Sequence, residues 1–87
     1  MKDEIARPSA PKAIVIEDHP DQGLVFRAAL GLAGYDVELI ADGATAVELL
    51  QQNAPALLVL DMHLPGMSGD KILDEIMEMP HLKDMHI

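Results

Sequence analysis

The chain has 87 residues, of which 49% are hydrophobic and 24% charged, and it carries a net charge of -9 at pH 7 with no cysteine. This composition is typical of one small folded domain and excludes intrinsic disorder of the whole chain. The acidic balance argues against binding to nucleic acid or to an anionic membrane surface, and the lack of cysteine excludes disulfides and thiolate metal sites.

The N-terminal residues predict a flexible tail. Residues 1–12 mix charges with Pro8 and Pro11, and a folded unit is expected over 13–87. The first residues are charged rather than apolar, so no secretory signal is predicted. No apolar run approaches the roughly 20 residues of a membrane span, so we expect a cytoplasmic protein without a membrane partner.

Short apolar runs alternate with helical patterns from residue 13 onward. Ala13–Glu17 is apolar until its last residue, which predicts a strand buried on both faces. Pro20 suits the first turn of a helix, and Gly34 is expected to end that helix. Tyr35–Ile40 predicts a second strand. The apolar positions that recur at helical spacing between them are Leu24, Val25, Ala28 and Leu32.

The second half continues the alternation. Asp42 is predicted to cap a helix that Asn53 and Pro55 end, and Ala56–Asp61 predicts a third strand. A loop then leads to a third helix, which begins at Ser68 or Gly69 and ends at Pro80. His81–Met85 is expected to be a linker before a fourth strand that begins at His86. The expected faces of the two helices are Ala46, Val47 and Leu50, and then Ile72, Leu73, Ile76 and Met79.

This order of elements predicts an α/β fold: a parallel sheet with right-handed crossovers and helices on both faces. Glu17, Asp18 and Asp61 stand at the carboxyl ends of the first and third strands, where open α/β sheets bind ligands. In a strand order of 2-1-3 these two strands are neighbours, so the acids converge. Crowded carboxylates repel one another, and an oxygen-liking cation such as Mg²⁺ is the expected occupant.

At these residues the sequence resembles the receiver domains of bacterial response regulators in two-component signalling. The resemblance is carried by the acid pair Glu17-Asp18 and by Asp61, which Pro65 and Gly69 follow at four and eight residues. It extends from about Ala13 to Ile87. It implies a flavodoxin-like fold of which three βα units and the start of the fourth strand are present.

By this resemblance, Asp61 is the phosphoacceptor, which takes a phosphoryl group from a sensor histidine kinase or a phosphotransfer protein. Asp18 and Asp61 are expected to ligate Mg²⁺ directly, together with the backbone carbonyl of His63, and Glu17 at least partly through water. The chain is expected to be a signalling module rather than a turnover enzyme.

The resemblance also predicts what is missing. The family's Ser or Thr after strand four and Lys after strand five have no counterpart in this sequence, so we expect impaired switching. The third strand is expected to be an exposed edge that allows self-association.

Other interpretations stay open. One is a non-catalytic shortened receiver that binds a kinase or another receiver. Another is a phosphohydrolase with an aspartyl nucleophile, although such enzymes usually carry a second acid where His63 stands. His19 and His63 beside the acids also fit a transition-metal site, because imidazole suits Zn, Fe or Ni. His81 and His86 are expected to be solvated.

Overall fold

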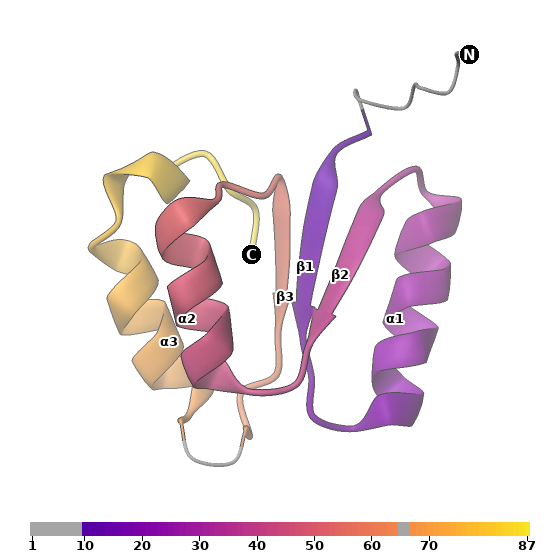
Figure 1. Cartoon of the computed structure of the whole chain (residues 1–87), viewed down its shortest axis with the longest axis horizontal. Coiled ribbons are helices and arrows are strands. Elements are labelled where there is room, and N and C mark those ends of the chain that lie inside the picture. Colours follow the sequence, from indigo (N-terminus) through magenta and orange to yellow (C-terminus); the bar gives the residue numbers. More distant parts are fainter. Residues whose placement is uncertain (1–9, 65–66) are drawn as a thin grey trace.

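The computed structural model describes residues 10–64 and 67–87. Three parallel strands form one sheet in the order β2-β1-β3, and Figure 1 shows α1 on one face of it and α2 with α3 on the other. The predicted fold class and strand order are thus confirmed. The bounds are β1 Lys12–Ile16, α1 Pro20–Leu32, β2 Asp36–Ile40, α2 Gly43–Gln52, β3 Leu57–Leu60 and α3 Gly69–Met77.

The predicted tail falls mostly outside these residues. Residues 1–9 are not described, and neither are Pro65 and Gly66 of the loop after β3. Lys12, assigned to the tail from the sequence, is the first residue of β1. Its ammonium lies 3.1 Å from the Asp36 carboxylate, where β2 begins.

β1 is the buried centre of the sheet, as its unbroken apolar run predicts. Ile14 pairs with Glu38 of β2 and with Leu58 of β3. Residues Ala13 to Ile16 are at most 1% exposed. Burial on both faces therefore fixes β1 between its two neighbours, and this in turn fixes where the residues after it emerge.

The main core lies between the sheet and the α2–α3 pair. Its side chains come from β1, β3, the loop after β3, both helices and the C-terminal segment; the buried members are Ile14, Ile16, Ala46, Val47, Leu50, Leu58, Leu64, Ile72, Ile76 and Leu82. The expected faces of α2 and α3 thus point into the core at Ala46, Val47, Leu50, Ile72 and Ile76. In a chain this small, such aliphatic burial is the main stabilising contribution.

The buried face of α1 is not the one that its apolar spacing indicated. Leu24, Val25 and Leu32 are 57%, 68% and 91% exposed, and the one fully buried position of the helix is Gly23. The reason is that α1 rests on β2 through this residue, where an added Cβ would lie 3.5 Å from Leu39 Cδ1. The periodic apolar residues form a different face, which the described residues leave largely exposed.

Capping residues set the helix ends as predicted. Gly34, with φ of 100°, follows α1, and the N–H groups of Gly34 and Tyr35 donate to the carbonyls of Gly31 and Leu30, each at 3.0 Å. This is the bond pattern of a Schellman motif. The Asp42 carboxylate accepts from Thr45 N–H at 2.8 Å at the start of α2, and Ser68 Oγ accepts from Lys71 N–H at 3.3 Å at the start of α3.

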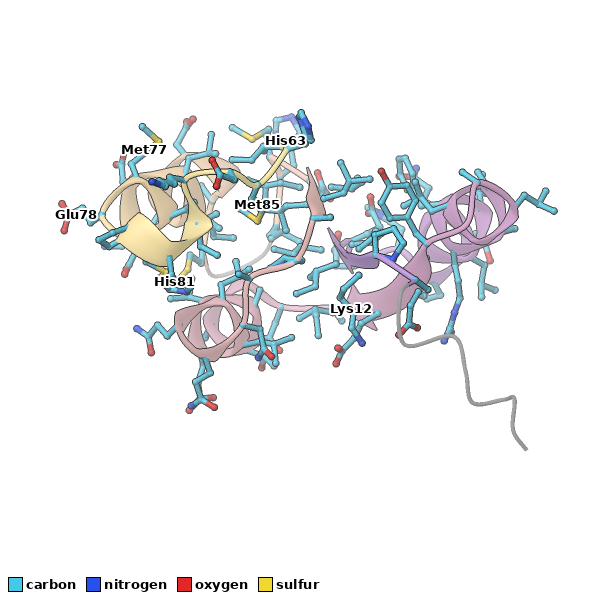
Figure 2. All side chains as sticks on the ribbon, turned by 90° about the horizontal axis from the view of Figure 1, so that it is seen from above. Lys12, His63, Met77, Glu78, His81 and Met85 are labelled. Carbon is cyan, nitrogen blue, oxygen red and sulfur yellow. The ribbon has the colours of Figure 1, made fainter. Side chains whose placement is uncertain are left out.

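The C-terminal segment differs from the predicted linker. α3 ends at Met77 rather than at Pro80, and Pro80–Leu82 forms a short 3-10 helix, η1. Leu82 is buried in the core. Figure 2 shows His81 turned toward α2, and its Nε2 lies 2.7 Å from the Leu50 carbonyl. His81 as a whole is exposed, as expected, although this ring nitrogen contacts α2.

The predicted start of a fourth strand is present as a single bridge beside β3. His86 pairs in parallel with Leu57, its N–H donates to the Ala56 carbonyl at 3.0 Å, and its carbonyl accepts from Leu58 N–H at 2.7 Å. In the described part of the chain, no other residue pairs with this side of β3. Self-association through this edge stays a prediction.

A pair of glycine substitutions tests the end of α1. Gly34→Ala should destabilise the protein by about 1–2 kcal/mol, because an L side chain disfavours positive φ. Gly31→Ala is the matched control: it adds a methyl group to the same helix where no atom lies within 4 Å. It should stabilise by about 0.5–1 kcal/mol. Urea unfolding measures both, and equal effects would contradict the left-handed cap.

The cap of α2 should depend on pH. The backbone hydrogen bond from Thr45 lowers the pKa of Asp42 below its ordinary 3.8. A lowered folded-state pKa stabilises above the unfolded value and is lost as pH falls through the folded value. Asp42→Ala should therefore lower Tm by a few degrees at pH 7, and this gap should narrow below about pH 4. Thermal unfolding of the wild type, Asp42→Ala and the non-titrating Asp42→Asn from pH 7 to pH 2.5 measures it. A gap that is constant with pH would contradict a capping carboxylate.

Candidate metal site

Parallel pairing brings three acids to one edge of the sheet. The carboxyl ends of the strands all lie at the bottom of Figure 1, where Glu17 and Asp18 follow β1 and Asp61 follows β3. The hydrogen-bond ladder continues one residue beyond the strands. Glu17 N–H donates to the Ile40 carbonyl at 2.9 Å, and Asp61 N–H donates to the Ile16 carbonyl at 3.0 Å. The acids therefore extend from a fixed backbone.

The side chains of these residues converge. One ligand atom each from Glu17, Asp18, His19 and Asp61 lies within 4.8 Å of the other three. The sequence predicts the three acids together; the participation of His19 follows from its place in the turn between β1 and α1. No other group of this kind occurs among the residues that the structure describes.

Asp61 is oriented by the loop that follows it. Its Oδ1 accepts a hydrogen bond from His63 N–H at 2.9 Å. This bond is the main reason that the pKa of Asp61 lies below its ordinary value. A carboxylate that is ionised and held in one orientation is prepared both to ligate a cation and to act as a nucleophile.

Glu17 and His19 form a pair within the site. The Glu17 side chain is only 6% exposed, and its Oε2 lies 3.0 Å from His19 Nδ1 and accepts from His19 N–H at 3.2 Å. The hydrogen bond to Glu17, followed by the charge of Asp18, raises the pKa of His19. The imidazole, 65% exposed, thus stands at the solvent side of the acids.

One oxygen of Asp18 has no hydrogen bond. Asp18 Oδ1 is fully buried and accepts none from the described residues, although His19 Nδ1 lies 3.3 Å away. A buried carboxylate oxygen without a partner is unfavourable unless a cation or a proton satisfies it. This unsatisfied oxygen, with Glu17 and Asp61 beside it, fits a divalent ion that takes oxygen ligands.

The other histidines lie elsewhere or contribute differently. The main chain of His63 lies at the site through its N–H, but its imidazole is not among the clustered groups. The two-histidine metal site considered from the sequence is therefore not formed. His81 contacts α2, and His86 lies at β3. The carbonyl of His63 as a ligand stays a prediction.

The match to known proteins decides the family. The model of the response regulator receiver domain matches residues 13–87. The chain belongs to this family. It shares 37% identity over 68 residues with the sensor histidine kinase TmoS of Ectopseudomonas mendocina, and 34% over 77 residues with the phosphate regulon regulatory protein PhoB of Rhizobium meliloti. These stretches cover 78% and 88% of the chain but 7% and 34% of those proteins.

Solved receiver domains share the fold of this one. A receiver domain of a histidine kinase from Syntrophus aciditrophicus superposes with a TM-score of 0.78 at 28% identity, covering 85% of this chain and 56% of that one. A receiver domain from a sensor histidine kinase of Pseudomonas aeruginosa gives 0.74 at 31% identity, covering 77% and 55%. The latter holds a magnesium ion in its active-site cleft. The chain thus spans little more than half of the solved receivers that it matches.

Membership of the family sets the general role. Receiver domains are generally phosphoacceptors of two-component systems, interact with histidine kinases or phosphotransfer proteins, and bind Mg²⁺ in their active site. The described part of the chain also contains no helix that is long and apolar enough to span a bilayer.

Gly69 tests whether the loop after β3 positions Asp61. A Cβ at Gly69 would lie 2.7 Å from Met62 Cα and 3.2 Å from the Asp61 carbonyl oxygen, so the backbone must shift. Gly69→Ala should destabilise by about 1–3 kcal/mol and weaken Mg²⁺ binding several-fold. Gly31→Ala, which adds its methyl group in open space, is the control. Unchanged stability and Mg²⁺ affinity in Gly69→Ala, by urea unfolding and calorimetry, would contradict this positioning.

Proposed function

We propose that this chain is a phosphoacceptor module in which Asp61 takes a phosphoryl group from a histidine of a partner kinase or phosphotransfer protein, with Mg²⁺ at Glu17, Asp18 and Asp61. The observation that carries the proposal is the approach of these three carboxylates to within 4.8 Å at adjacent strand ends. The proposed receiver unit consists of residues 13–87, which the family model matches, together with Lys12, the first residue of β1.

The proposed step is a displacement at phosphorus. An Asp61 carboxylate oxygen forms a new O–P bond, the P–N bond to the partner's imidazole breaks, and the bonding electrons leave with that nitrogen. The product is an acyl phosphate. A bound Mg²⁺ would neutralise charge on the transferring group and lower the repulsion between it and the site.

The residues of this chain contribute position and charge. The His63 N–H bond holds the Asp61 carboxylate in one orientation, which reduces the entropy lost on reaching the reactive geometry. Asp18 supplies the buried, unsatisfied oxygen that supports direct ligation. Glu17 already accepts two hydrogen bonds from His19, which supports a role partly through water.

The rival interpretations differ in what they require of Asp61. A non-catalytic receiver that only binds partners needs no intact acceptor, so its partner affinity would survive Asp61→Ala. A phosphohydrolase needs a general acid near the nucleophile. The residue two positions after Asp61 is His63, whose imidazole lies outside the cluster, so this chain lacks an acid at the position where such enzymes usually carry one.

Labelling by a small acyl phosphate with Mg²⁺ tests the proposal. The intact chain should gain the mass of one phosphoryl group, and Asp61→Asn should remove the gain completely because an amide is a poor nucleophile. Asp70→Asn is the matched control, since Asp70 is an exposed acid in the first turn of α3. It should label normally.

The outcomes separate the alternatives. Labelling that persists in Asp61→Asn, or that is lost in Asp70→Asn, would overturn the assignment of Asp61. Labelling that is independent of added Mg²⁺ after treatment with a chelator would overturn the metal requirement. Continuous release of phosphate by the unmodified chain would favour the hydrolase.

A further inference from the structure

His19 brings a nitrogen donor to a site that otherwise offers oxygen. Its Nδ1 lies within the same 4.8 Å group as the ligand atoms of Glu17, Asp18 and Asp61. The imidazole is 65% exposed, so its position at the acids is not imposed by burial in the core. Its contacts in the described structure are with the acids: 3.0 Å to Glu17 Oε2 and 3.3 Å to Asp18 Oδ1.

The spacing of these atoms suits a shared ion. Two ligands of a tetrahedral ion, each about 2.1 Å from it, are separated by about 3.4 Å. Atoms that lie within 4.8 Å of one another reach that arrangement with shifts of at most about 0.7 Å each. An exposed imidazole can make such a shift by side-chain rotation alone.

The position of Nδ1 supports the same conclusion. Asp18 Oδ1 is buried without a hydrogen bond, and His19 Nδ1 lies 3.3 Å from it. Neighbouring ligands at about 2.1 Å from a tetrahedral ion lie about 3.4 Å apart, close to this separation. The two atoms are thus placed as neighbouring ligands of one ion.

We propose that His19 is a direct ligand at this site, its Nδ1 proton leaving to solvent when the metal binds, and that the site therefore binds Zn²⁺ more tightly than Mg²⁺. The inference rests on the proposed cation site and adds its metal preference. One imidazole and three carboxylates provide the four nitrogen and oxygen donors that Zn²⁺ takes in tetrahedral sites, whereas Mg²⁺ gains little from imidazole. Zn²⁺ would then compete with Mg²⁺ for the acids.

Calorimetric titration of the intact chain with Zn²⁺ and, separately, with Mg²⁺ at pH 7.5 tests the proposal. His19→Ala should weaken Zn²⁺ binding by at least about tenfold, because even groups that only orient a ligand contribute about 10–100-fold. Mg²⁺ affinity should change by less than about threefold. Because His19 is exposed, the variant should fold, and circular dichroism checks this.

His86→Ala is the matched control. It removes the same side chain from an exposed position at the edge of β3, where the main chain alone forms the bridge. Its Zn²⁺ and Mg²⁺ affinities should equal those of the wild type. A second measurement, the ¹⁵N chemical shift of His19 Nδ1, should change on addition of Zn²⁺ and not on addition of Mg²⁺.

The results separate this inference from the proposed function. Equal loss of Zn²⁺ affinity in His19→Ala and His86→Ala, or no loss in either, would overturn the role of His19 even if Asp61 is labelled normally. A ¹⁵N chemical shift of His19 Nδ1 that does not change on addition of Zn²⁺ would also overturn the role of His19 as a ligand. A selective loss in His19→Ala supports the inference even if Asp61 accepts no phosphoryl group, in which case only the proposed function fails.

Discussion

Repulsion between carboxylates at one edge of a parallel sheet is the constraint around which this molecule is organised. The pairing of Ile16 with Leu60 places the residues that follow them side by side, so Asp61 lies close to Glu17 and Asp18. At separations of 4.8 Å or less, such charges raise one another's free energy unless hydrogen bonds, protons or a cation compensate. The structure supplies part of that compensation through the His63 N–H and the His19 imidazole. The compensation is incomplete, because the buried Oδ1 of Asp18 has no hydrogen bond from the described residues.

The rest of the fold holds these acids in place against their repulsion. β1 is buried on both faces, and the core on the α2–α3 side fixes β3 beside it. The acids begin one residue after these strands, where the hydrogen-bond ladder is still intact. The aliphatic core thus contributes the free energy that keeps the charges close, and the site inherits its geometry from the register of the strands.

Much of this arrangement could be predicted from the sequence, because it depends on local signals. The unbroken apolar run of β1, Gly34 after the first helix and Asp42 before the second each report on their own backbone conformation. Together with a strand order of 2-1-3, these signals are sufficient to place Asp61 next to Asp18.

What failed depends on contacts between distant segments. The apolar spacing of α1 identified a face but not which face meets the sheet, because a contact through Gly23 leaves no hydrophobic signal in the sequence. The hydrogen bond of His81 was not predicted, because its partner is a main-chain carbonyl, Leu50, 31 residues earlier in the chain. The place of His19 beside the acids was predicted, but the contact of its Nδ1 with Glu17 depends on a side-chain rotamer in the turn after β1.

The unequal packing of the two faces of the sheet has a consequence for motion. Asp61 follows a strand packed against the main core, whereas Glu17 and Asp18 lead into α1, whose buried contact is confined to Gly23. Local opening therefore requires less free energy on the α1 side, and amide protons there exchange with solvent sooner than those of α2. An ion shared by Asp18 and Asp61 links the α1 side to the main core. Its binding free energy therefore slows amide exchange in α1, a helix that it does not contact.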